Sequence, residues 1–178
     1  LGARAGASAP RSPGLRWIGT GCVQAPAWRL AAGDAAAPAV PAPARFRGGI
    51  ALEGVEMEPR LVPGEPARLR LFWRVKASAD TDGLAVFVHF KRGADTLFQD
   101  DHLFLAGLRG MEEAGRCDRW VQERRIVVPE TLATGGLDLE LGLYRVVAGK
   151  ARRLPVRTSF PAPKNGVRVP AGLRVAAE

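Results

Sequence analysis

The sequence predicts an all-β protein, a two-sheet antiparallel β-sandwich of the immunoglobulin-like or jelly-roll-like kind. Apolar and polar residues alternate over 67–76 and again over 137–144, and such alternation gives a strand one buried face. Six or seven segments of this type follow one another at short spacing, separated by Gly-, Pro- and Asp-rich turns. No segment shows a convincing amphipathic helical period. Two packed sheets would bury the apolar faces together.

Three parts are expected along the chain. Residues 1–45 are rich in Ala, Pro and Gly and predict a linker, or an N-terminal segment partly docked through Trp17, Ile18 and Trp28 as a short edge strand. Residues 46–160 form the sandwich, and residues 161–178 a basic C-terminal tail. With 178 residues, 47% of them hydrophobic, the chain suits one domain with a sizeable core.

The first half of the sandwich contains three expected strands. In 50–57 the apolar pattern shifts by one position across Gly54, as a β-bulge at glycine would produce. The turn at 63–66 leads into 67–76, where Trp73 shares the apolar face and is expected in the core. The strand at 84–90 is apolar on both faces and is therefore expected to be central.

The second half is less regular at first. Residues 91–118 have no clear period, which is typical of a functional loop or of a strand that crosses between sheets. Strands are then expected at 120–128 and 137–144. A hairpin turn at 148–150 leads into a last strand at 151–156.

The net charge of +8 is unevenly distributed. Residues 46–160 hold 18 Lys and Arg against 16 Asp and Glu, so the excess lies mostly in the flanks. A nearly neutral sandwich lacks the concentrated positive field that phosphate binding uses, and no nucleic-acid partner is expected. The basic flanks favour solubility or proximity to a membrane surface. No apolar run reaches the roughly 18 residues of a spanning helix and no intact signal peptide is visible, so a soluble, mature or excised piece is expected.

Two groups of side chains are candidates for ligand binding. Phe72 lies between Arg70 and Arg74 on the polar side of its strand, and Trp120 begins another strand; either ring could carry a sugar, although a solvated face with one covered aromatic is the plainer interpretation. The second group comprises His89, Asp100, Asp101 and His102. It could bind a ligand, a Ca²⁺ or Zn²⁺ ion included, or form a structural polar network; it lacks the fixed spacing of a metal site.

No catalytic residue, cofactor or metal is expected. The only histidines are His89 and His102, and neither a nucleophile elbow nor a phosphate-binding loop is present. An independent enzyme is therefore not predicted. Cys22 and Cys117 allow one disulfide, and the sequence leaves open whether it forms.

Five short elements carry a resemblance when their order and spacing are taken together. They are Pro63-Gly64-Glu65, Leu71-Phe72-Trp73-Arg74-Val75, Val86-Phe87-Val88-His89-Phe90, Gln99-Asp100-Asp101-His102, and Leu141-Gly142-Leu143-Tyr144 followed by Gly149. Over roughly 46–158 the chain resembles the extracytoplasmic C-terminal β-sandwich of bacterial and archaeal polytopic membrane glycosyltransferases. It more weakly resembles the carbohydrate-binding sandwich of polysaccharide ABC transporter ATPases.

The resemblance implies a non-catalytic accessory or carbohydrate-binding-like module beside a membrane-bound glycan-assembly enzyme. It implies a location outside the cytoplasmic membrane, in the periplasm or cell envelope, and a glycan or envelope protein as partner. One departure is the loop before Trp120, which has Glu112, Glu113 and Cys117 in place of a Pro-Thr-Ser-like segment. The alternative is a structural protein-interaction sandwich in an envelope assembly.

Overall fold

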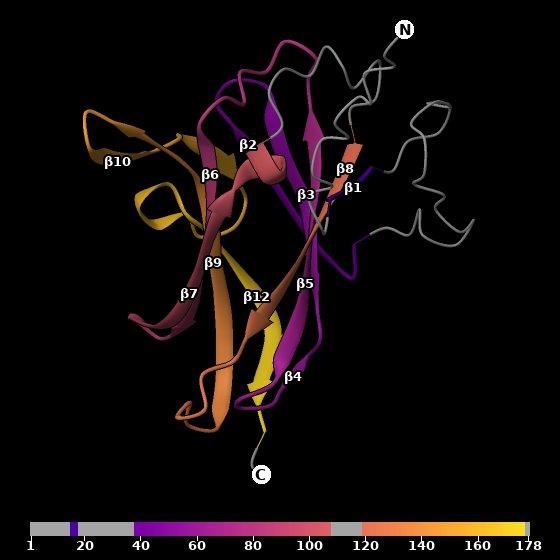
Figure 1. Cartoon of the computed structure of the whole chain (residues 1–178), viewed down its shortest axis with the longest axis vertical. Coiled ribbons are helices and arrows are strands. Elements are labelled where there is room, and N and C mark those ends of the chain that lie inside the picture. The colour runs from indigo at the N-terminus through magenta and orange to yellow at the C-terminus, as the bar shows by residue number, and fades with distance from the viewer. Residues whose placement is uncertain (1–14, 18–37, 108–118, 177–178) are drawn as a thin grey trace, which may run out of the picture.

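A computed structural model describes residues 15–17, 38–107 and 119–176. These residues form two β-sheets that face each other, joined by turns and short 3-10 helices (Figure 1). The predicted two-sheet β-sandwich is therefore confirmed. Among the described residues, no helix is long and apolar enough to cross a membrane.

Sheet A is antiparallel throughout. Its strands, in spatial order, are β1 (Leu15–Trp17), β8 (Arg119–Val127), β5 (Pro66–Val75), β3 (Ile50–Met57), β2 (Val40–Phe46) and β11 (Val156–Thr158).

Sheet B lies across the core from sheet A (Figure 1). Its strands, in spatial order, are β4 (Arg60–Leu61), β12 (Val167–Val175), β9 (Gly135–Val147), β6 (Leu84–Arg92) and β7 (Asp95–Leu103), with β10 (Lys150–Arg153) paired to the end of β9. All pairs are antiparallel except β4 with β12. The 3-10 turns η1 (Phe104–Gly107) and η3 (Pro163–Asn165) follow β7 and precede β12.

The core fills the space between the sheets with the inward residues of each strand. In β5 the residues Leu69, Leu71, Trp73 and Val75 are fully buried, as their alternation predicted. The Trp73 ring packs edge-on against Phe104, with ring centroids 5.1 Å apart. Strand β6 lies between β9 and β7, so its prediction as an interior strand is also confirmed.

The predicted bulge at Gly54 is present in β3. Leu52 lies opposite Trp73 of β5, whereas Gly54 lies opposite Phe72, so the register slips by one residue between them. A Cβ at Gly54 would lie 2.4 Å from the Pro38 side chain, which real contacts do not allow. Glycine is needed here because the chain before β2 passes directly over the bulge.

The predicted start of the sandwich at residue 46 is wrong. Residues 40–46 are not linker but strand β2, in which Ala42 and Ala44 are buried while Pro41 and Pro43 point outward. The alternation was not recognised because the buried residues are alanines that alternate with prolines. Near the start of the chain, Leu15–Trp17 pairs with β8 as a short edge strand, which is one of the two alternatives for residues 1–45. Ile18, Trp28, Cys22 and Cys117 lie outside the described residues.

The predicted end of the sandwich at residue 160 is also wrong. Residues 167–175 of the expected basic tail form β12, a strand inside sheet B between β4 and β9. Val167, Val169, Leu173 and Val175 are buried, and the register shifts between Val169 and Leu173. The intervening Pro170-Ala171-Gly172 breaks the period of the strand, which is why the alternation was not recognised.

Candidate binding site on the outer face of sheet B

The outer face of sheet B, the face turned away from sheet A, gathers polar side chains from three adjacent strands. Val86, Val88 and Phe90 of β6 are fully buried in the core, so the alternate residues Phe87, His89 and Lys91 point outward. The strand pairing places His89 beside Glu140 of β9 on one side and Gln99 of β7 on the other. Residues far apart in sequence therefore share one surface.

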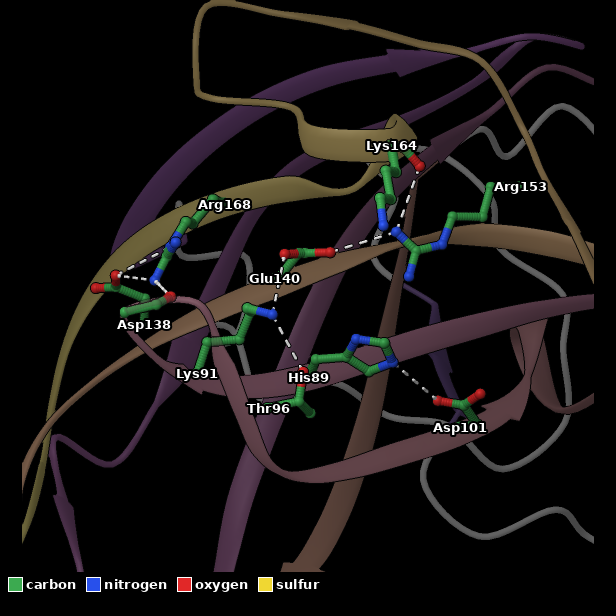
Figure 2. Close-up of polar contacts among 10 residues, drawn as sticks. His89, Lys91, Thr96, Asp101, Asp138, Glu140, Arg153, Lys164 and Arg168 are labelled. Atoms are coloured by element: carbon green, nitrogen blue, oxygen red, sulfur yellow. Dashed lines mark hydrogen bonds and ion pairs between the residues drawn. The ribbon is translucent and has the colours of Figure 1, made fainter.

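Glu140 lies at the centre of this surface and is nearly buried. Its carboxylate lies 3.8 Å from the Lys91 ammonium and accepts a hydrogen bond of 3.3 Å from Arg153 (Figure 2). Lys91 also donates to the Thr96 hydroxyl at 3.1 Å. A buried carboxylate needs such partners, because without them its desolvation would be costly.

Phe87 forms the apolar floor of the site. The Arg153 guanidinium lies over its ring at 4.0 Å from the centroid, in a cation–π arrangement. The His89 and Tyr144 rings lie 5.0 and 6.4 Å from it, centroid to centroid. Gly142 makes this packing possible, because a Cβ there would lie only 2.7 Å from the Phe87 ring.

The segment around η3 covers one side of the site. Arg153 donates to the Lys164 carbonyl at 3.3 Å, which ties β10 to this segment (Figure 2). Gly166 follows η3, and a Cβ at that position would lie 2.9 Å from the Glu140 carboxylate. Further along the sheet, Arg168 of β12 donates to the Asp138 carboxylate at 3.1 Å. Polar groups of β9, β10 and β12 are thus held in fixed positions.

Two groups at the β7 side of the site have shifted protonation equilibria. Burial lowers the pKa of His89 below its ordinary value of 6.5, more strongly than the Asp101 carboxylate, 4.0 Å away, raises it. Burial, together with the charge of Asp101 and a hydrogen bond to it, raises the pKa of Tyr144. At neutral pH the site therefore presents an uncharged imidazole and a protonated phenol beside a carboxylate.

The predicted cluster of His89, Asp100, Asp101 and His102 is divided by the sheet. His89 and Asp101 lie on the outer face, whereas Asp100 and His102 point toward sheet A, because neighbouring residues of β7 face opposite ways. The expectation of a single cluster is therefore wrong. For residues 91–118 the sequence left a functional loop and a strand as alternatives, and residues 95–103 form the strand β7.

Asp100 and His102 form a bridge between the two sheets with Arg124 of β8. His102 Nδ1 donates to Asp100 at 2.7 Å, and Arg124 donates to both oxygens of the same carboxylate at 3.1 and 3.2 Å. Burial raises the pKa of Asp100, but the hydrogen bonds from His102 and Arg124 together outweigh it and bring the pKa to about 2. This part of the predicted cluster is a structural polar network, one of the two interpretations left open.

The outer face of sheet A does not provide the predicted aromatic platform. Phe72 is only 3% exposed and packs with Val121, and Trp120 is 7% exposed in the core. Arg70 pairs with Glu56 and Glu123, at 3.3 and 3.0 Å, and Arg74 pairs with Glu53 at 2.8 Å. The interpretation of Phe72 and Trp120 as accessible sugar-binding rings is therefore wrong, and Phe72 is covered, as the plainer interpretation held. Both arginines form cross-strand ion pairs.

Known proteins offer little comparison at the level of sequence. No family model matches the chain, and no curated protein matches it. Among solved structures, the crystal structure of the C-terminal domain of Wzt is similar, at 14% sequence identity and a TM-score of 0.47. The match covers 79% of this chain and 83% of that one. The resemblance to the glycosyltransferase-linked sandwich stays a prediction.

Among the residues that the structure describes, no metal cluster marks the site. Within the described ranges, no three His, Cys, Asp or Glu side chains come together in a way that could hold a metal ion. A shallow cavity of about 540 Å³ lies elsewhere, at the β4 edge of sheet B. Its lining consists of Pro59, Arg60, Gly172, Arg174, Val175 and Ala176.

Sequence reasoning missed much of this surface. Lys91, Glu140, Tyr144 and Arg153 were not among the predicted residues, although Glu140 and Tyr144 stand at the polar positions of the clearest alternating strand. Their positions on a central strand between two others could have signalled a shared surface. The hairpin that carries Arg153 was predicted, but the position of Arg153 over the Phe87 ring depends on how β9 pairs with β6, for which the sequence holds no local signal.

Proposed function

We propose that this chain is a non-catalytic carbohydrate-binding module whose glycan site is the outer face of sheet B around His89, Asp101 and Tyr144. The observation that carries the proposal is the convergence of the sequence motifs on this surface. Motifs at 86–90, 99–102 and 141–144 form adjacent strands β6, β7 and β9, and their outward residues meet around Phe87.

The chemistry of the surface suits a sugar. A glycan presents hydroxyls that both donate and accept hydrogen bonds, and C–H faces that pack against aromatic rings. Asp101 accepts, the Tyr144 ring offers a partly exposed aromatic surface, and the neutral His89 ring both donates and accepts. Because the Arg153 and Glu140 side chains are already fixed by each other, little conformational entropy is lost when a ligand binds beside them.

The resemblance supports a wider setting for this module. We propose that it acts as an accessory domain to membrane-bound glycan assembly, outside the cytoplasmic membrane. The glycosyltransferase-linked sandwich that the chain resembles belongs to enzymes using lipid-linked sugar donors, and its sandwich supplies no catalytic residue. In this setting the module would hold an acceptor or product glycan near the membrane-bound enzyme.

A glycan array followed by calorimetric titration tests the proposal. We expect saturable binding to at least one envelope glycan, and Asp101→Asn combined with Tyr144→Ala should weaken it at least about tenfold, the effect of losing a charged hydrogen bond. Arg125→Gln, an exposed change on the outer face of sheet A, is the matched control and should bind as the wild type does.

Two outcomes would overturn the proposal. One is the lack of saturable binding to any glycan on the array, together with a stable protein partner in a pull-down, which would favour the structural-interaction alternative. The other is glycan binding that the double variant leaves intact, which would place the site on another surface.

A further inference from the structure

The hairpin formed by β9 and β10 extends beyond the rest of sheet B. Strand β9 pairs with β6 as far as Arg145 and with β12 only as far as Leu141, so neither neighbour continues along the last residues of β9. Val146 and Val147 are therefore paired with β10 alone. Figure 1 shows this hairpin projecting at the upper left of the molecule.

The tip of the hairpin is apolar and exposed. Val146 is 64% exposed and Val147 is 50% exposed, and among the described residues they are the only adjacent pair of large exposed hydrophobic side chains. Ala148 and Gly149 form the turn, with φ of 50° and 73°. The exposed Ala151 lies opposite Val146. We refer to residues 146–151 as the hairpin tip.

Basic residues flank the hairpin tip. The hairpin segment 144–153 contains Arg145, Lys150, Arg152 and Arg153 and no Asp or Glu. Lys150 and Arg152 are exposed, and Arg152 lies directly opposite Arg145 across the hairpin. Like charges directly opposite each other are unfavourable. Asp80 offsets part of this charge through its ion pair with Arg145 at 2.8 Å, and Lys150 and Arg152 remain at the surface.

We propose that the hairpin tip docks on an anionic lipid surface, with Val146 and Val147 entering the headgroup region and Lys150 and Arg152 contacting acidic headgroups. Exposed apolar side chains bordered by basic ones are the pattern of interfacial membrane binding. Anionic headgroups complement the positive charge of the exposed Lys150 and Arg152. A narrow projecting tip offers far less area than a stable protein interface needs, which favours a lipid surface over a protein partner.

Vesicle co-sedimentation tests this proposal with the full chain. Wild-type protein should sediment with vesicles that mix phosphatidylglycerol into phosphatidylcholine, more strongly than with phosphatidylcholine alone, and less as salt is raised. Lys150→Gln with Arg152→Gln should weaken binding to the mixed vesicles by about fivefold for each residue. Val146→Ser with Val147→Ser should weaken it severalfold while keeping the salt dependence.

Val127→Ser is the matched control, because Val127 is a 68% exposed valine on β8 of the other sheet. It should sediment as the wild type does, and circular dichroism should show that all variants fold. The proposal is overturned if the wild-type protein does not co-sediment with phosphatidylglycerol vesicles, or if either double variant binds them as strongly as the wild type does. Since no lipid is needed for glycan titration, this proposal and the proposed function can fail separately.

Discussion

The bridge of Asp100, His102 and Arg124 allows a quantitative test of how the two sheets are held together. Asp100 lies on β7 of sheet B and Arg124 on β8 of sheet A, and the carboxylate accepts hydrogen bonds from both partners at 2.7 to 3.2 Å. Asp100→Asn keeps the shape of the side chain and removes its charge. We expect this change to destabilise the protein at neutral pH.

The magnitude follows from the pKa of Asp100, which falls from 3.8 to about 2 on folding. At 1.36 kcal/mol per pKa unit, this shift corresponds to about 2 kcal/mol. Because the Asp100 and Arg124 side chains are only partly buried, solvent screening reduces the expected loss of unfolding free energy to about 1 to 2 kcal/mol. The folded-state pKa lies below the unfolded value, so the contribution is complete above pH 3.8 and disappears as the pH falls toward 2.

Urea unfolding followed by tryptophan fluorescence measures this effect. The free energy of unfolding of the variant should lie below that of the wild type at neutral pH, and the two should converge as the pH falls toward 2. Asp95→Asn, an exposed change on the same strand, is the control and should cost little. Equal stability of variant and wild type at neutral pH, or a deficit that does not shrink in acid, would refute the reasoning.

Two further predictions concern the outer face of sheet B. Burial lowers the pKa of His89 on folding, so the free energy of unfolding of the wild type should decrease as the pH falls below 6.5, and that of His89→Gln should decrease less. Urea unfolding at a series of pH values measures this difference. Parallel pH profiles of the two proteins would contradict it. Gly142→Ala should lower the free energy of unfolding by about 1 to 3 kcal/mol through overpacking against Phe87. Gly136→Ala on the same strand is the control, because a Cβ at Gly136 would lie 3.9 Å from its nearest neighbour. This change should lower the free energy of unfolding far less in the same thermal or urea measurement. An equal loss in both variants would show that Phe87 is not the cause.

Local sequence determined which face is buried in the strands whose alternation is clear. The alternation in β5 placed Leu69, Leu71 and Trp73 in the core, and the slip at Gly54 located a bulge, because both features depend only on residues close together in the chain. The sequence failed where alternation was masked, by prolines in β2 and by Pro170-Ala171-Gly172 in β12. It also failed at Asp100 and Asp101, which were grouped although they point to opposite sides of β7.

Only the tertiary structure decided how the outward residues are used. Arg70 was predicted to bind a ligand, whereas it pairs with Glu123, which lies 53 residues away on β8. Phe72 stands among arginines on β5, yet Val121 opposite it on β8 helps to bury it. On sheet B, Glu140 becomes a site residue because Lys91 and Arg153 reach it from neighbouring strands. These outcomes depend on strand order and register, which long-range pairing sets and no local pattern encodes.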